Sequence, residues 1–168
     1  MNSKILKKLK ILIVCGGWSN EREISLLSGK NIFQCLKSNH FNVEIFYLNR
    51  SNVENIFKKK PDLIFNALHG EFGEGGFLSN LAQKNNILIT HSDDLTSALC
   101  FNKRLLKEFL KKKLKVKSPI EITESKSIKF PVISKPNRGG SSNGIKLINN
   151  QAIFKNTLKN KQLLIEEA

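Results

Sequence analysis

Four short apolar runs, separated by segments with helical spacing, most constrain how this chain folds. The first run, Ile11–Cys15, is continuously apolar, as strands inside parallel sheets are. Further strands are expected at residues 42–48, 62–68 and 87–90, with a helix before each of them. Strands that alternate with helices predict a parallel, right-handed, doubly wound sheet over residues 4–94, which places the chain in the α/β class.

The loops and helices that connect these strands can also be predicted from the sequence. Asn20 and Glu23 fit a capping box at the start of the first helix. Two glycine-rich loops, 16–19 and 69–76, follow the first and third strands, at the carboxyl edge where such sheets bind ligands. The later helices are expected at residues 52–60 and 77–84. The first helix should pack its recurring apolar and small residues on the sheet, namely Ile24, Leu27, Ser28, Ile32, Cys35 and Leu36.

The pattern changes after residue 95, and we divide the chain into domains 1–95 and 96–168. Short strands in the second part favour an antiparallel sheet with helices, and Pro119 should keep its segment at a sheet edge. No element follows Leu163, Leu164 and Ile165, so the apolar face of that strand is expected to lie uncovered. The expected elements are helices at 98–113 and 150–158 and strands at 116–122, 131–135, 145–148 and 162–167.

The segment 131–145 is the strongest candidate for a binding site on residue types alone. A β-forming run leads into a glycine–serine turn, and successive N–H groups in such a turn can hold a phosphate. Lys135 brings a point charge to the same place. Ile145 stands where the P-loop pattern requires lysine, so that pattern is not met, and a plain hairpin is the alternative. The turn contains Gly139, Gly140, Ser141, Ser142 and Gly144.

The net charge and the cysteines of the chain indicate which partners and which compartment to expect. The formal net charge of +14 admits nucleic-acid binding, but the positive charge is almost entirely lysine spread along the chain, whereas arginine makes bidentate base contacts. We therefore expect no nucleic-acid partner. Cys15, Cys35 and Cys100 have neither metal-ligand nor redox spacing, and they are expected to be buried, reduced thiols of a cytosolic protein. The first apolar run is too short for a secretory leader, and no segment is long enough to span a membrane.

Four stretches, in matching order and spacing, together resemble the D-alanine–D-alanine ligases of the ATP-grasp superfamily. The resemblance covers essentially all of this chain but only the first half of such an enzyme. It implies a doubly wound N-terminal domain, of the pre-ATP-grasp type, followed by an incomplete ATP-grasp lobe. Trp18, Gly75 and Asn143 depart from the family pattern. The stretches are Gly16–Ser25, Ala67–Gly76, Ser97–Lys103 and Ile133–Gly144, and the terminal Leu164–Glu166 also fits.

The resemblance also implies an activity. The family uses ATP to join two D-alanines for peptidoglycan, and hence for cell-wall synthesis and cell shape. The carboxylate of the first D-alanine becomes an acyl phosphate, and the amine of the second displaces phosphate. A cytoplasmic enzyme with ATP, Mg²⁺ and D-alanine is implied, with a possible homodimer through the N-terminal domain and no membrane partner. The magnesium ligands are expected in the missing half, so this chain alone is expected to be inactive.

Two other functions are left open at this point. One is a related ATP-grasp carboxylate–amine ligase of different specificity, such as a D-alanine–D-lactate enzyme. The other is a non-catalytic remnant that binds nucleotide or a partner.

Site residues follow from the same resemblance. Glu21 is expected to hold the ammonium group of the first D-alanine, and Ser141 to orient Glu21. His69 is expected to be a polar contact of that substrate. The remaining assignments concern ATP: Lys103 and Lys135 at the phosphates, Ser142 and the Gly140 backbone as a lid over them, and Glu166 beside the adenine. Without the resemblance, Glu21 is simply an acid in a first helical turn, His69 a loop cap and Lys103 a solvated lysine. Ser25 is then a helix residue with no other role, and Glu71 and Glu74 are loop surface.

Overall fold

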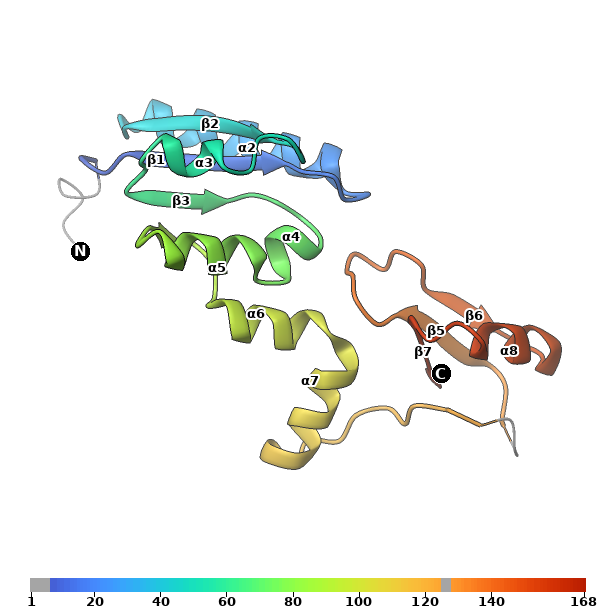
Figure 1. Cartoon of the computed structure of the whole chain (residues 1–168). Coiled ribbons are helices and arrows are strands. Elements are labelled where there is room, and N and C mark those ends of the chain that lie inside the picture. Colours follow the sequence, from blue (N-terminus) through green and yellow to red (C-terminus); the bar gives the residue numbers. More distant parts are fainter. Residues whose placement is uncertain (1–6, 125–127) are drawn as a thin grey trace. The chain divides into compact units, whose positions relative to one another are not determined.

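The computed structural model describes residues 7–124 and 128–168. The chain divides after Ala98 into two compact units, which we call the N unit and the C unit (Figure 1). The expected boundary between residues 95 and 96 falls within helix α6 (Asp94–Phe101). None of the helices in the described ranges combines the length and the apolar character that a membrane span requires.

The N unit is built on a four-stranded parallel sheet in the order β2-β1-β3-β4. Strand β1 lies inside the sheet, where Ile11 pairs with Val43 on one side and with Leu63 on the other. All six residues of β1 are buried, which explains why its sequence is continuously apolar. The strands are β1 (Ile11–Gly16), β2 (Val43–Leu48), β3 (Leu63–Asn66) and β4 (Leu88–Ile89).

Helices cover both faces of this sheet (Figure 1), which confirms the predicted doubly wound α/β fold. One core cluster includes Ile56 of α3 and Leu78 of α5, and a separate cluster includes Ile32 of α2. Two expectations were inaccurate: α3 is a single turn, and the loop after β3 contains the short helix α4. The helices are α2 (Arg22–Ser38), α3 (Asn55–Lys58), α4 (Glu71–Glu74) and α5 (Phe77–Lys84).

The buried face of α2 differs from the expected one. Ile24 and Leu27 are 54% and 58% exposed, so the helix is rotated relative to the predicted face. Gly29 allows a close approach to the sheet, because a Cβ built there would lie 2.5 Å from the Cβ of Cys15. Apolar spacing missed this face because small residues make its closest contacts. The inward residues are Ser25, Leu26, Gly29, Ile32, Phe33 and Leu36.

The start of α2 also corrects the sequence-based expectation. The N-cap residue is Glu21, which makes no side-chain cap bond, so the predicted capping box of Asn20 and Glu23 is wrong. The backbone N–H of Glu21 instead donates to Ser19 Oγ at 3.2 Å. This bond fixes the backbone of Glu21 just after the first glycine-rich loop.

The C unit contains a three-stranded antiparallel sheet in the order β6-β5-β7, as predicted. Helix α8 (Gln151–Leu158) packs on it through the fully buried Phe154. Asn150 begins this helix, because its Oδ1 accepts the N–H of Ile153 at 3.0 Å. The strands are β5 (Val132–Pro136), β6 (Lys146–Ile148) and β7 (Leu163–Glu167).

The single helix expected at 98–113 is divided into three. After α6 come α7 (Lys103–Phe109) and a π-helix, η1 (Leu110–Leu114). Asn102 is extended, and its Oδ1 accepts the N–H of Leu105 at 3.2 Å, so it is the N-cap of a new helix. This break places Lys103 in the first turn of α7.

Two expectations at the edge of the C-unit sheet were wrong. In the segment 116–122, the described backbone forms an isolated bridge between Glu121 and Glu166 rather than a strand. The face of β7 is not uncovered either, since Leu164 is fully buried and Ile165 is 3% exposed. Ile165 packs in one cluster with Phe154 of α8, which supplies the missing cover.

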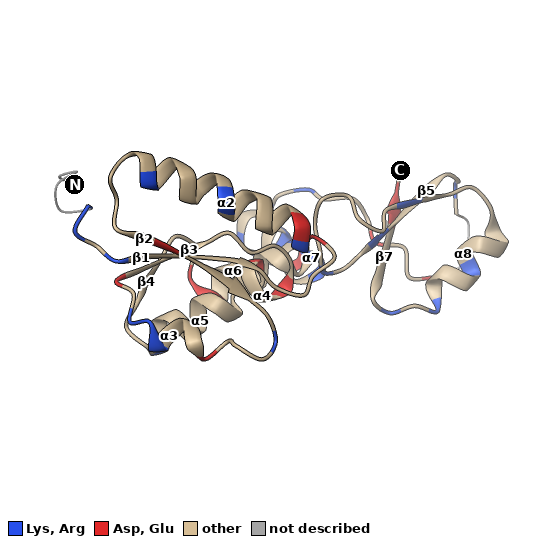
Figure 2. Ribbon diagram, turned by 90° about the horizontal axis from the view of Figure 1, so that it is seen from above, with Lys and Arg blue, Asp and Glu red and all other residues tan. Residues whose placement is uncertain are grey.

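The cysteines differ in burial, and the basic residues are spread over both units. Cys15 is buried, and burial raises the pKa of its thiol to about 11. Cys35 and Cys100 are exposed, so the expectation of three buried thiols was wrong. Lys and Arg occur on elements of both units, α2, α3 and α8 among them (Figure 2).

Candidate functional site

The glycine turn between β5 and β6 has a backbone that most side chains avoid. Gly139 and Gly144 have φ values of 125° and 77°, and Ser141 and Ser142 are also left-handed, at 52° and 57°. Non-glycine residues in this region are uncommon, and they cluster at ligand sites. A Cβ built at Gly139 or Gly140 meets no atom within 4 Å, so the turn is open on that side.

Lys103 is held against this turn. Its backbone N–H donates to Asn137 O at 3.0 Å, and its Nζ donates to Gly139 O at 2.7 Å. Burial lowers the pKa of the Lys103 ammonium, nearby Lys135 lowers it further, and Glu166 opposes both effects. The lysine therefore belongs to a cluster of charges and is not simply solvated.

Glu166 lies at the centre of that charge cluster. Its side chain is 3% exposed and accepts from two ammonium groups, that of Lys107 at 2.5 Å and that of Lys135. Burial alone raises the pKa of this carboxyl, but the hydrogen bonds from Lys107 and Lys135 outweigh it, and the pKa of Glu166 is lowered. Sequence reasoning assigned Glu166 to adenine and did not anticipate that it pairs with Lys135.

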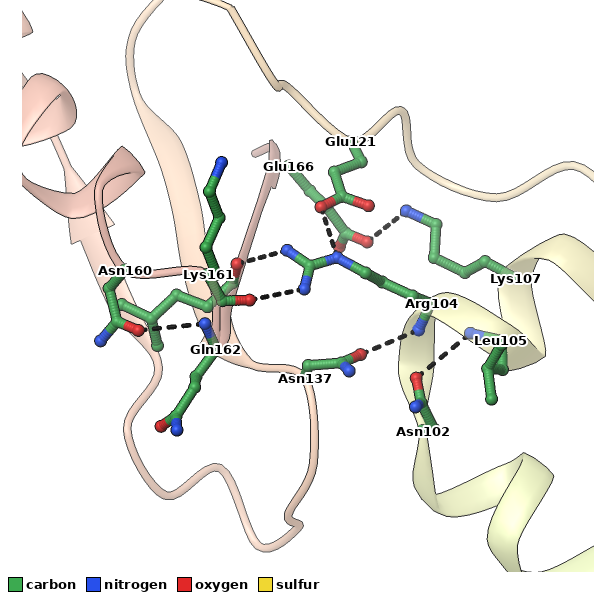
Figure 3. A network of polar contacts seen from close by, with 11 residues as sticks. Asn102, Arg104, Leu105, Lys107, Glu121, Asn137, Asn160, Lys161, Gln162 and Glu166 are labelled. Carbon is green, nitrogen blue, oxygen red and sulfur yellow. Dashed lines mark hydrogen bonds and ion pairs between the residues drawn. The ribbon is translucent and has the colours of Figure 1, made fainter.

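Arg104 connects α7 to β7 (Figure 3). Its Nε donates to Glu121 Oε1 at 2.8 Å, and its two terminal nitrogens donate to the carbonyls of Lys161 and Leu163 at 2.7 and 2.6 Å. Its backbone N–H donates to the side chain of Asn137 at 3.0 Å. These bonds fix the first turn of α7, and with it the origins of the Lys103 and Lys107 side chains.

Arg104 and Lys107 were missed by sequence reasoning. The signal for Lys107 was its spacing, since residues four apart lie on one face of a helix and Lys103 was already a candidate. The signal for Arg104 was its scarcity in a lysine-rich chain, because a planar guanidinium can bond several acceptors at once.

In the N unit, His69 follows β3 and lies beside Glu74. Its Nδ1 is 3.7 Å from Glu74 Oε1, and Glu74 Oε2 accepts the N–H of Gly70 at 2.8 Å. The prediction that Glu74 is loop surface was therefore wrong. Its carboxylate links α4 to the loop that carries His69.

Ser25 joins the two loops that follow β1 and β3. Its hydroxyl is fully buried, accepts the N–H of Gly16 at 2.8 Å and donates to Ala67 O at 2.6 Å. Gly16 precedes the loop that leads to Glu21, and Ala67 precedes His69. Ser25 thus has a structural role that sequence reasoning did not give it.

Trp18, bulky for its turn, is accommodated by neighbours from other loops. Its ring lies 4.8 Å from that of Phe72, and the Arg50 guanidinium carbon is 5.4 Å from a Trp18 ring centroid. The side chain is 38% exposed. The three residues follow β1, β2 and β3, so they lie at the carboxyl edge of the sheet.

The predicted site residues fall into two sets. The C unit brings Lys103, Lys135, Glu166 and the glycine turn together, whereas Glu21 and His69 belong to the N unit. The expected bond between Ser141 and Glu21, which would join the units, stays a prediction. Within the described ranges, no group of three or more His, Cys, Asp or Glu side chains could hold a metal ion.

Comparison with known proteins shows which proteins are similar to this chain in sequence. No protein-family model matches the chain. It is 37% identical to the D-alanine–D-alanine ligase of Pelagibacter ubique, over 94% of the chain and 57% of that protein. It is 36% identical to the ligase of the same name from Anaplasma marginale, over 83% of the chain and 44% of that protein. The chain thus spans about half the length of these curated relatives.

Solved structures give the same result. The D-alanine–D-alanine ligase of Bacillus anthracis superposes with a TM-score of 0.74 at 25% identity, over 95% of the chain and 57% of that structure. The VanG D-Ala:D-Ser ligase of Enterococcus faecalis shares the fold, with a TM-score of 0.75 at 22% identity, over 95% of the chain and 62% of that structure. Sequence and fold together identify this chain as a homologue of the D-alanine–D-alanine ligases, matching the N-terminal half of those proteins.

Proposed function

We propose that this chain contributes the first substrate site and part of the nucleotide site of an ATP-dependent D-alanine–D-alanine ligase. The product, D-alanyl-D-alanine, would serve peptidoglycan synthesis in the cytoplasm. The supporting observation is that Lys103 bonds to the open turn 139–144 and interacts electrostatically with Lys135. Phosphoryl transfer depends mainly on positioning and charge neutralisation, and two neighbouring ammonium groups near an exposed glycine–serine turn suit that task.

The roles of the individual residues follow from this assignment. Lys103 and Lys135 would neutralise the ATP phosphates while the terminal phosphoryl group moves to the D-alanine carboxylate. Ser142 and the Gly140 backbone would cover the phosphates, and Glu166 would stand at the adenine end of the site. These groups bind and orient the nucleotide, and proton transfer is not assigned to any of them.

In the N unit, Glu21 would bind the ammonium group of the first D-alanine. Ser141 would orient the Glu21 carboxylate, and His69, held by Glu74, would contact the same substrate. A carboxylate is the natural partner of an ammonium group, because a charge-assisted hydrogen bond is roughly twice as strong as a neutral one. Assembly as a homodimer through the N unit belongs to the same proposal.

Mg²⁺ is also part of the proposed reaction, but the described residues do not fit a magnesium site by themselves. Metal ions that bridge ATP phosphates are held by oxygen ligands, and carboxylates are the usual ones. No step of the reaction is therefore assigned to Mg²⁺ through residues of this chain. The ligands of the metal are expected elsewhere in the enzyme.

A chimera tests the proposed function. The chain would replace the matching region of the Pelagibacter ubique ligase, to which it is 37% identical, and phosphate release would be followed with ATP, Mg²⁺ and D-alanine. We expect D-alanine-dependent phosphate release from the chimera. Glu21→Gln should raise the KM for the first D-alanine far more than the KM for ATP, since it keeps the volume and removes the charge. Lys135→Ala should instead weaken ATP binding, by about 1.5–3 kcal/mol for a lost charge-assisted bond. A chimera that folds but releases no phosphate would contradict the proposal.

A further inference from the structure

Lys107 lies outside every role assigned above, yet it makes one of the shortest ion pairs in the C unit. We infer that Lys107 is a positioning residue that keeps Glu166 neutralised, so that Lys135 is free to leave Glu166 and bind a nucleotide phosphate. The inference rests on the proposed function, because it concerns the same phosphate site. It gives Lys107 an effect on nucleotide affinity without contact to the nucleotide.

The first argument is the burial of Glu166. Its side chain is 3% exposed, while those of Lys107 and Lys135 are 19% and 25% exposed. A buried carboxylate that loses its counter-charge is strongly destabilising. Lys135 can therefore move away from Glu166 only if another cation stays beside that carboxylate.

The second argument is geometric. Lys107 bonds to Oε1 of Glu166 and Lys135 to Oε2, so each oxygen has its own ammonium group. Removing Lys135 leaves the bond to Oε1 unchanged. The Nζ of Lys103 is bonded elsewhere, since it donates to the carbonyl of Gly139. Lys107 is thus the cation positioned to stay with Glu166 when Lys135 moves.

The third argument is that Lys107 comes from a fixed element and Lys135 from the edge of the site. Lys107 lies one turn after Lys103 on α7, which Arg104 fastens to the start of β7 and the turn before it, through the Leu163 and Lys161 carbonyls (Figure 3). Lys135 is the penultimate residue of β5, the strand that leads into the open glycine turn. A phosphate bound at that turn would compete with Glu166 for Lys135, and it would not compete for Lys107.

The prediction is a non-additive pattern of binding constants. Without Lys107, Lys135 is the ammonium group that remains bonded to Glu166, and phosphate must displace it from a buried carboxylate. Lys107→Met should therefore weaken nucleotide binding about tenfold or more, the equivalent of one charge-assisted hydrogen bond. If Glu166 is replaced as well, Lys135 is no longer retained, and affinity should return. If the role of Lys107 were merely structural, replacing Glu166 as well would weaken nucleotide binding further.

Calorimetry on the 168-residue chain tests this pattern, with ATP and inorganic tripolyphosphate as probes. The variants are Lys107→Met, Glu166→Gln and their combination. The controls are Lys107→Arg, which keeps the charge, and Lys111→Met, which removes an exposed lysine one turn further on. We expect Lys107→Met alone to bind the probes about tenfold more weakly than the natural chain. The affinity of the double variant should lie within about twofold of that of Glu166→Gln, a difference well under one hydrogen bond. Equal affinity in Lys107→Met and Lys111→Met, or a double variant weaker than either single one, would overturn the inference.

A second measurement keeps the inference separate from the proposed function. Without nucleotide, the rate at which an amine-acylating reagent modifies Lys135 can be followed by mass spectrometry of the same variants. Lys135 should react more slowly in Lys107→Met than in the natural chain, and faster in the double variant. Failure of the natural chain to bind either probe would refute the phosphate site, while the labelling rates would still decide the role of Lys107. Unchanged labelling of Lys135 in Lys107→Met would refute that role.

Discussion

Replacement of the buried Ser25 by alanine should destabilise the N unit by an amount that the structure allows us to estimate. The hydroxyl accepts the N–H of Gly16 and donates to the carbonyl of Ala67, at 2.8 and 2.6 Å. Ser25→Ala leaves one donor and one acceptor without a partner, at about 1–3 kcal/mol each, which makes about 2–6 kcal/mol together. The better helix propensity of alanine returns about 0.5 kcal/mol, so the net loss should be about 1.5–5.5 kcal/mol.

Urea unfolding of the variant, with Ser28→Ala as the matched control, measures this loss. Ser28 lies on the same helix, is half-buried, and should change stability by less than about 0.5 kcal/mol when replaced. Hydrogen exchange supplies the specific observation, because the Gly16 amide loses its acceptor and should lose protection. A loss below about 1 kcal/mol, with unchanged protection of Gly16, would show that the hydroxyl does not stabilise the two loops as argued.

Three further predictions concern the C unit and its partners. Arg104→Lys should lower the stability of the C unit by about 1.5–3 kcal/mol in urea unfolding, because the single ammonium nitrogen of lysine does not replace the three guanidinium nitrogens that bond Glu121 and two carbonyls. The pKa of Glu166 is lowered in the folded state, so its contribution to stability is present above the ordinary carboxyl pKa and lost as the pH falls through the lowered one. Acid unfolding of Glu166→Gln should lack that dependence. Nucleic-acid binding seen at low salt should vanish near 0.15 M salt in a filter-binding assay, and tight, sequence-dependent binding there would contradict the expected absence of such a partner.

A fifth prediction concerns turnover. The 168-residue chain alone should give no D-alanine-dependent phosphate release with ATP and Mg²⁺, because its described residues contain no metal-ligand group and it spans about half of its relatives. Release at the rate of the chimera would show that the described residues suffice for the reaction.

The fold of the N unit could be predicted because each element carries its own pattern. The continuous apolar run Ile11–Cys15 required a buried central strand, and the alternation of strands and helices required a parallel sheet. The buried face of α2 could not be predicted in the same way. Its tightest contacts come from Ser25 and Gly29, which an apolar periodicity does not count.

The C unit was predicted less well, since its elements depend on contacts that are distant in sequence. Asn102 interrupts the long helix by capping α7, and a side chain that caps one helix does not show in a hydrophobic pattern. The segment 116–122 looked like a strand but is fastened by Arg104 and by a single bridge to Glu166. The turn 139–144 and the lysine before it could be predicted from residue types, whereas the pairing of Glu166 with Lys107 joins residues 59 apart in the sequence.

Trp18 and Tyr47 are the only tryptophan and the only tyrosine of the chain, and both belong to the N unit. Fluorescence excited near 295 nm therefore comes from one ring, which touches Phe72 and the Arg50 guanidinium at the carboxyl edge of the sheet. The C unit, whose aromatic residues are all phenylalanines, contributes nothing to that emission. Unfolding followed by emission reports on the N unit, whereas far-ultraviolet circular dichroism reports on both. The difference between the two curves is then a direct record of whether the units unfold together.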